Sequence, residues 1–458
     1  MKIKKLKLEN FRAFKSFECD FEPDINVLVG LNGQGKTSIL EAIAIAYGQF
    51  VGGFGTGKDK NISTSDVRLA KTMLSMGNSL SGTENSNMEG YSMELQFPTI
   101  INVKSFSDQD SEFPSEWQRS RNTLKGGTTK VKDLNNNAKK LQKMVQDGTF
   151  VPLPLFVYYD TNRLWNDSFS PATKIPTKKS SRLDGYDDWF KPHSNYKVFS
   201  QWLYQETIAS FERKMHISEM STADNSGLTF GNRHQKSLNA VTNAVNTVLS
   251  PSGWSSLRYS ATEKQIVATH EKQGDVPIFM LSDGIRNMIA MVADIAYRAV
   301  KLNFYLGERA VLDTTGIVLI DEVDMHLHPS WQRSILQSLT MAFPKIQFIV
   351  TTHSPLVISD IKGINVCLLS DSKKATKLPE LYGEDANTVL LEIMDTDIRN
   401  TEINIKLNDL LDAVHDSNID KAKELLSILE TELPVTNIEL SKARLLLRKK
   451  ELLNAKNK

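Results

Sequence analysis

A phosphate-binding loop constrains this chain more than any other feature of its sequence. Residues 30–37 read Gly-Leu-Asn-Gly-Gln-Gly-Lys-Thr and fit the pattern G-x-x-x-x-G-K-[ST]. The apolar run 25–29 precedes the loop, and the apolar helical pattern 38–46 follows it. Binding of a triphosphate requires strand, glycine loop and helix in this order, because backbone N–H groups at a helix N-terminus must approach the anion closely. The chain is therefore predicted to bind a nucleoside triphosphate.

The residues of this loop have separate expected tasks. Glycines let the backbone come close to the phosphates, since a Cβ atom would stand in the way. Lys36 is expected to reach the β- and γ-phosphates, and Thr37 is expected to offer its hydroxyl to Mg²⁺. The residues expected to bind the nucleotide here are Gly30, Asn32, Gly33, Gln34, Gly35, Lys36, Thr37 and Ser38.

Two motifs downstream would add the groups needed to hydrolyse the bound triphosphate. Asp321 and Glu322 end an apolar run, where the first carboxylate is expected to hold Mg²⁺ through water and the second to polarise the attacking water. His353 follows another apolar run and is expected to contact the γ-phosphate and the same water. Glu322, His353 and Lys36 are the expected catalytic residues, and Thr37 and Asp321 the expected magnesium ligands.

A third motif, Leu-Ser-Asp-Gly at 281–284, precedes the helical pattern 287–300. Ser282 in the N-cap position would make a helix N-terminus able to hold a phosphate that is bound to another subunit. Read alone, the same residues would be an ordinary helix cap. Ser282 and Gly284 are accordingly expected to contact nucleotide carried by a second copy of the chain.

The order of these motifs resembles the ABC-type ATPase core shared by the SMC and RecF proteins and the OLD-like ATPases, within the AAA ATPases in the broad sense. The opening Leu-Glu-Asn-Phe-Arg-Ala-Phe at 8–14 also resembles theirs, and this resemblance places Arg12 beside the nucleotide phosphates. It implies an α/β fold: an ABC-type ATPase head, with a mixed sheet, P-loop and helical lobe, helical insertions and a C-terminal helical domain. The implied cofactors are ATP and Mg²⁺, and the preference for ATP over GTP comes from the resemblance alone.

Two segments depart from the transporter type of this core. His-Leu-His-Pro at 326–329 follows the acid pair and is similar to the OLD-like ATPases. His326 and His328 are not expected to bind metal, because no cysteine or further histidine lies nearby in sequence. The loop that senses the γ-phosphate usually carries glutamine in this family. The candidate here is Tyr-Tyr-Asp-Thr-Asn-Arg at 158–163.

Composition sets the organisation and the compartment that we expect. The formal net charge is +1, the chain has two cysteines, and no stretch of about 20 apolar residues occurs. A cytoplasmic protein without membrane contact is expected. The expected parts are a first ATPase lobe with the P-loop (1–104), a polar inserted segment (105–150), a core strand plus helical insertion (151–275), a second ATPase lobe with signature, acid pair and His353 (276–384), and a C-terminal helical interaction domain (385–458).

The ending of the chain separates the OLD-like types. A fused Toprim nuclease would need a long further domain with spaced acidic ligands, whereas helical patterns and the basic run 448–450 follow here. This ending resembles the PtuA family of the Septu and retron anti-phage systems, which works with a separate HNH nuclease, PtuB. The resemblance implies a defence ATPase that binds and hydrolyses ATP between two protomers. Its expected partners are itself, as a homodimer or higher homo-oligomer, and a PtuB-like HNH nuclease subunit, with DNA or other nucleic acid as a further candidate.

Other functions stay open at this point. A RecF- or SMC-like DNA repair ATPase would need coiled-coil arms or a strongly basic surface. The sequence contains no sustained heptad pattern, and its formal net charge is only +1. An ATP-binding scaffold with little turnover is a second alternative, which a comparison of wild type with Glu322→Gln would separate from an ATPase. A transporter motor is the least supported, because of the long central insertion and the His-Leu-His-Pro segment.

Overall fold

The computed structural model describes residues 1–56, 58–74, 90–106, 113–161, 181–190, 196–221, 233–370, 374–434 and 436–456. These residues form two compact units, Met1–Ala386 and Asn387–Lys458. Within the described segments, the helices are all too short or too polar to cross a membrane.

A six-stranded, mainly parallel sheet lies at the centre of the first unit. Its strand order is β15-β14-β3-β13-β12-β8, and only the β14–β15 pair is antiparallel. Every residue of β3, β8, β12 and β13 is buried, as the continuous apolar runs of these strands require when both faces of a sheet are covered. The strands are β3 (Ile25–Val29), β8 (Leu155–Tyr159), β12 (Gly316–Ile320), β13 (Ile346–Thr351), β14 (Asn365–Leu368) and β15 (Thr376–Lys377).

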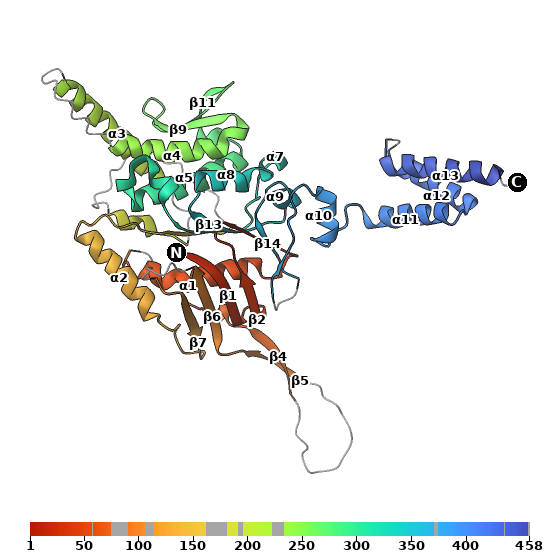
Figure 1. Ribbon diagram of the computed structural model, residues 1–458, viewed down its shortest axis with the longest axis horizontal. Coiled ribbons are helices and arrows are strands. Elements are labelled where there is room, and N and C mark those ends of the chain that lie inside the picture. The colour runs from red at the N-terminus through yellow and green to blue at the C-terminus, as the bar shows by residue number, and fades with distance from the viewer. Residues whose placement is uncertain are drawn as a thin grey trace, which may run out of the picture. The chain divides into compact units, whose positions relative to one another are not determined.

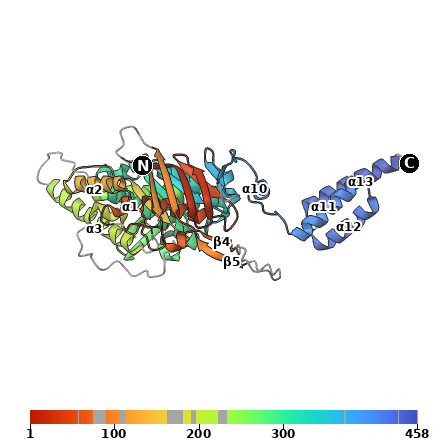
Figure 2. The ribbon, with the colours of Figure 1, turned by 90° about the horizontal axis from the view of Figure 1, so that it is seen from below.

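A four-stranded antiparallel sheet lies beside the central sheet, with strand order β2-β1-β6-β7 (Figures 1 and 2). Helix α1 (Lys36–Gly52) contacts strands of both sheets. It is apolar on nearly all sides and is buried along most of its length, which suits a helix between two layers. The strands of the antiparallel sheet are β1 (Lys2–Phe11), β2 (Phe14–Asp20), β6 (Thr99–Phe106) and β7 (Glu116–Arg121).

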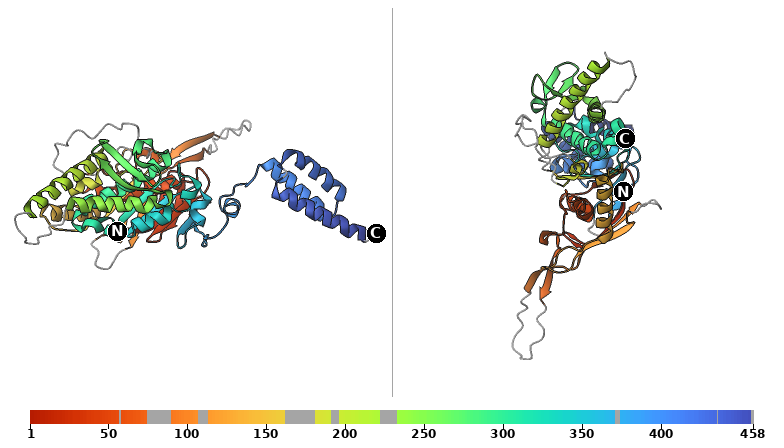
Figure 3. Two further views of the ribbon diagram at one scale, coloured as in Figure 1. Left: turned by 90° about the horizontal axis from the view of Figure 1, so that it is seen from above. Right: turned by 90° about the vertical axis from the view of Figure 1, so that its left-hand side faces the viewer.

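A helical lobe covers the β8 side of the central sheet. Helix α5 (Asp283–Leu302) is buried along most of its length and contacts β8. The expected helical insertion in 151–275 is present as α3 (Tyr196–Ser221) and α4 (Arg233–Leu249), which lie side by side (Figure 3). A small sheet follows, formed by β9 (Trp254–Ser260), β10 (Gln265–His270) and β11 (Gly274–Pro277). Short helices complete the unit: α6 (Ala310–Asp313), α7 (Pro329–Gln332), α8 (Ile335–Ala342) and α9 (Pro355–Ser359).

Two segments hold more structure than their composition indicates. The glycine- and serine-rich composition of residues 51–88 is typical of a loop, yet β4 (Leu69–Leu74) pairs with β5 (Gly90–Leu95) in an antiparallel ladder. The polar segment 105–150 supplies β7 and helix α2 (Lys132–Gln146), which contacts α1. The apolar residues that α2 buries, Leu134 and Ala138, are four positions apart and therefore lie on one face.

The second unit is a three-helix bundle of α11 (Thr401–His415), α12 (Ile419–Glu432) and α13 (Ile438–Lys456). Asn400 and Asn418 cap the first two helices by accepting backbone N–H bonds. Most of the apolar residues that recur at helical spacing form its core: Leu407, Leu410, Val414, Ala422, Leu429, Leu440, Ala443 and Leu447 are buried. Leu411, Leu425 and Leu426 are partly buried, and Leu446, which has the same spacing, is 47% exposed. Helix α10 (Ala386–Glu392) lies where the two units meet in sequence. The predicted mixed-sheet head with a helical lobe and C-terminal helices is thus confirmed.

Candidate active site

Three predicted motifs meet at one edge of the central sheet. Strands β3, β13 and β12 are parallel neighbours, so their carboxyl ends lie together. The loop 30–35 leaves β3, the segment 352–354 leaves β13, and Asp321 directly follows β12. Residues that are some 280–320 positions apart in sequence are therefore brought to one place.

The glycine loop has the backbone that close approach to phosphate needs. Gly30, Gly33 and Gly35 have φ angles of 148°, 84° and 90°, in the region that residues with a Cβ rarely adopt. A Cβ atom on Gly35 would lie 2.5 Å from the ring of Phe14, and one on Gly30 would lie 2.6 Å from the Leu369 carbonyl oxygen. Gly30 and Gly35 are therefore required for two reasons: their backbone conformation disfavours other residues, and the space around them leaves no room for a side chain.

The Lys36 ammonium is held inside this loop. Its Nζ donates to the carbonyl oxygens of Gly30 at 2.7 Å and Leu31 at 3.1 Å. Burial lowers the pKa of Lys36, while the carboxylates of Asp321 and Glu322 act in the opposite direction. A partly desolvated cation in a ring of backbone groups is suited to binding a phosphate anion.

Asp321 links the glycine loop to the neighbouring strand. Its Oδ2 accepts from the Thr37 hydroxyl at 2.7 Å, and its Oδ1 accepts from the Thr351 hydroxyl at 2.6 Å. The carboxylate is 3% exposed. A hydroxyl and a carboxylate in contact are hard oxygen ligands of the kind that Mg²⁺ prefers, so the donor set fits the predicted metal.

Thr351 positions both acids, a task that was not predicted from its sequence pattern. Its hydroxyl donates to Asp321 and accepts from the Glu322 N–H at 2.7 Å, and its carbonyl accepts from the Val323 N–H at 2.9 Å. Glu322 has a φ of 49°, an uncommon conformation for this residue type, which these bonds hold in place. The only mark of this task in the sequence is the motif Thr-Thr-His at 351–353, whose first threonine ends β13 and supplies the hydroxyl that contacts both acids.

His353 lies two residues after the end of β13 and is exposed at the same sheet edge. The residues on either side fix the segment: the Thr352 hydroxyl donates to Asp324 at 2.6 Å, and the Ser354 hydroxyl caps α9. The predicted contact of His353 with the γ-phosphate stays a prediction.

The signature segment forms the start of α5. Ser282 is the N-cap residue, it is exposed, and its hydroxyl makes no capping bond to the helix. Gly284 lies against the segment that follows the acid pair, since a Cβ there would be 2.4 Å from the His326 carbonyl oxygen. Their predicted contact with nucleotide on a second copy stays a prediction.

Arg12 lies beside the second turn of α1. Its guanidinium contacts the Glu41 carboxylate at 2.5 Å and Asp66 at 2.7 Å. Glu41 also accepts from the Lys60 ammonium at 3.2 Å. Lys60, Glu41 and Asp66 were not predicted from the sequence, because nothing in their local patterns marks them. The predicted contact of Arg12 with phosphate stays a prediction.

Two features predicted from the sequence remain, the histidines after the acid pair and the candidate sensing loop. His328 is the N-cap of α7 and accepts from the Ser330 N–H at 3.3 Å. The described part of the chain holds no group of three or more His, Cys, Asp or Glu side chains that could bind a metal ion. In the candidate sensing loop, Tyr158 and Tyr159 end β8, whereas Asn162 and Arg163 lie outside the described residues.

Comparison with known proteins agrees with this geometry. A family model described as AAA ATPase domain matches residues 1–358. The chain is 25% identical to the Retron Vc95 probable ATPase of Vibrio cholerae serotype O1 biovar El Tor, over 86% of this chain and 79% of that protein. It is also 25% identical to the Retron Ec83 probable ATPase of Escherichia coli, over 86% and 76%. The Septu protein PtuA of Bacillus thuringiensis is 23% identical, over 78% and 72%.

Proposed function

The chain belongs to the AAA ATPase domain family, and from this premise we propose that it binds ATP with Mg²⁺ between two copies of itself and hydrolyses it. The observation that carries the proposal is the pair of hydrogen bonds on Asp321. They join the glycine loop, through Thr37, to the strand that positions Glu322, through Thr351. Binding and hydrolysis groups are thereby held in one rigid assembly.

Each side chain has a task that follows from its surroundings. The Gly30–Gly35 backbone and the Lys36 ammonium bind the phosphates, and Thr37 and Asp321 would hold Mg²⁺. When bound, the metal neutralises charge on the phosphate oxygens. Glu322 is half-buried and accepts the proton of the attacking water as general base. The Thr351 hydroxyl keeps the Glu322 backbone in the position that this requires.

The second copy completes the site in this proposal. Ser282 is exposed at the start of a 20-residue helix, and its hydroxyl is not used to cap that helix. A helix N-terminus favours an anion through its free N–H groups and its dipole. We therefore assign Ser282 and Gly284 to the γ-phosphate of ATP that the other protomer carries.

The relatives support a defence role. Two are named retron probable ATPases and a third is a Septu protein, and together with the expected PtuA-like ending they favour an ATPase subunit of an anti-phage defence complex. In this complex the ATP state would control a separate, PtuB-like HNH nuclease subunit. The three-helix bundle of the second unit is the proposed interaction domain.

A pair of glutamate variants tests hydrolysis. Glu322→Gln removes the general base while keeping the size of the side chain, so turnover should fall by about 10²- to 10⁴-fold with ATP binding retained. Glu424→Gln, at an exposed position of α12, is the matched control and should leave turnover unchanged. Equal turnover in wild type and Glu322→Gln would instead support the scaffold alternative.

Measurement of mass tests the assembly. We expect mass photometry of the chain with an HNH protein encoded beside it to show one defined complex that contains both proteins. Failure to form this complex, with ATP-dependent dimers that retain DNA, would favour the repair alternative.

A further inference from the structure

Tyr158 lies deep in the sheet edge that carries the acid pair. It is the fourth residue of β8, is 2% exposed, and pairs with Leu319 of β12, two residues before Asp321. Neighbouring side chains on a strand point to opposite faces. Phe156, on the same face as Tyr158, stacks on Tyr47 of α1 with ring centroids 4.9 Å apart, so the Tyr158 ring is on the α1 side of the sheet.

The Tyr158 hydroxyl has no hydrogen-bond partner among the described residues. The next residue shows the contrast: the Tyr159 hydroxyl, on the other face, donates to Asp294 of α5 at 2.7 Å. Buried hydroxyl groups in native proteins are almost always paired, because burial removes their bonds to water. An unpaired hydroxyl at an active-site edge therefore suggests a partner that arrives with the ligand.

Strand pairing places Tyr158 near Asp321, since its partner Leu319 lies two residues before that carboxylate. Burial raises the pKa of the phenol, and the carboxylates of Asp321 and Glu41 raise it further. The phenol therefore stays protonated over the physiological range and can act only as a neutral group, with one O–H to donate. The same two carboxylates flank the glycine loop, since Asp321 bonds Thr37 and Glu41 follows it by one turn of α1.

Residues 58–62 form a segment, here called the strap, that places the Lys60 ammonium over the Tyr158 ring. The Lys60 ammonium lies 5.6 Å from the Tyr158 ring centroid and 4.1 Å from that of Phe190. Its Nζ also donates to Glu41 at 3.2 Å. The strap thereby covers the face of the ring with a cation that is itself anchored to α1.

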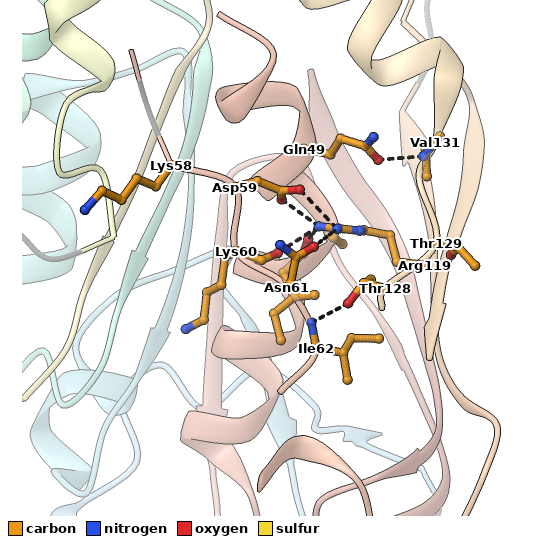
Figure 4. Close-up of polar contacts among 12 residues, drawn as sticks. Gln49, Lys58, Asp59, Lys60, Asn61, Ile62, Arg119, Thr128, Thr129 and Val131 are labelled. Atoms are coloured by element: carbon orange, nitrogen blue, oxygen red, sulfur yellow. Dashed lines mark hydrogen bonds and ion pairs between the residues drawn. The ribbon is translucent and has the colours of Figure 1, made fainter. Parts of the chain in front are cut away.

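Arg119 holds the strap in place, as Figure 4 shows. This arginine of β7 is fully buried and donates to the backbone carbonyls of Ile45 at 2.7 Å and Lys60 at 2.8 Å. It also donates to the Asn61 side chain at 2.6 Å and to Asp59 at 3.0 Å. The strap, β7 and α1 are therefore tied together by hydrogen bonds.

We propose that the Tyr158 hydroxyl donates a hydrogen bond to an oxygen of the bound Mg·ATP complex. The inference rests on the proposed nucleotide site and adds a residue to it. Tyr158 is the last residue but one of β8 and begins the segment 158–163, where the family's sensing loop was expected. The partner chemistry is a phosphate oxygen or a water bound to the metal, both of which accept a hydrogen bond.

The test compares two tyrosines that differ in one respect. Tyr158→Phe and Tyr47→Phe each remove a buried hydroxyl that lacks a partner within the described chain, but only Tyr158 lies on the strand paired with β12, which leads into the acid pair. For each variant of the full chain, the affinity for ATP·Mg²⁺ is measured by calorimetry, and the melting temperature is measured without nucleotide. A hydrogen bond to a charged acceptor corresponds to about a 10- to 100-fold change in affinity.

The expected result is a loss of ATP·Mg²⁺ affinity of about 10-fold or more in Tyr158→Phe and none in Tyr47→Phe. Neither variant should melt below wild type without nucleotide, because an unpaired hydroxyl contributes no bond there. Unchanged affinity in Tyr158→Phe would overturn the proposal. A lowered melting temperature without nucleotide would also overturn it, since the hydroxyl would then have a partner inside the protein. Failure of wild type to bind ATP would instead refute the proposed function.

Discussion

Replacement of Gly284 by alanine tests how the signature segment is built. A Cβ atom at this position would lie 2.4 Å from the His326 carbonyl oxygen and 3.3 Å from its carbonyl carbon. The clash is with backbone atoms, and two backbone hydrogen bonds hold this turn in place. The Met325 N–H donates to the Glu322 carbonyl oxygen and the Leu327 N–H donates to the Asp324 carbonyl oxygen, both at 3.0 Å. The start of α5 or the turn after the acid pair must therefore shift.

The magnitude follows from this clash. Added atoms in a packed region cost about 1–3 kcal/mol when neither side can relax freely. For a unit the size of Met1–Ala386, with about 2.1 cal/mol/K of unfolding entropy per residue, this corresponds to a melting temperature lower by about 1–4 °C. ATP turnover should fall as well, because the displaced turn begins at Glu322.

Gly127→Ala is the matched control. An added Cβ there meets nothing within 4 Å, so the substitution should leave stability unchanged or raise it by less than about 1 kcal/mol. Differential scanning calorimetry of both variants and wild type gives the comparison. Equal melting temperatures for Gly284→Ala and Gly127→Ala would refute the packing argument and leave nucleotide contact as the sole reason for glycine.

Three further outcomes follow from the contacts. Thr351→Val removes the bond from the Glu322 N–H and the bond to one oxygen of Asp321, so chemical denaturation should show a loss of about 2–4 kcal/mol. Arg119→Leu should cost about 3–5 kcal/mol by the same measurement, because it removes the buried cation beside Asp59 and the donor to the carbonyls of Lys60 and Ile45. Burial lowers the pKa of Lys36 from 10.5, so calorimetry should show ATP affinity falling as pH rises through the folded pKa and proton uptake on binding in that range. In the ATP-free protein the sign is opposite, because the unfolded chain holds more protons there, so the contribution of Lys36 to stability rises with pH.

The sequence predicted those parts of the fold whose signals are local. The loop 30–37 with its flanking strand and helix, the apolar run before Asp321 and the helical spacing of α11–α13 each appear as expected. Strand β4 was missed because its stability depends on pairing with β5, about 20 residues later, rather than on its own composition.

The candidate site was predictable only as far as its motifs extend. The tasks of Asp321 and Glu322 follow from their order, but the bonds from Thr351 that fix them depend on β12 and β13 being neighbours. Arg119 could not be predicted from the sequence, because it lies in a polar segment and is buried only where the strap and α1 supply its hydrogen-bond acceptors. Tyr158 could be placed at a strand end, whereas the missing partner of its hydroxyl is visible only in three dimensions.

The central claim, that two copies share each ATP site, is tested most directly by subunit complementation. Lys36→Ala removes the phosphate-binding cation, and Ser282→Arg places a bulky side chain at the exposed start of α5, so each variant alone should lack ATP turnover. In a mixed dimer one site combines an intact Lys36 with an intact Ser282 from the other copy. We predict that mixing the two inactive proteins restores turnover, and a mixture that stays inactive while both proteins are folded and form dimers would contradict the shared site.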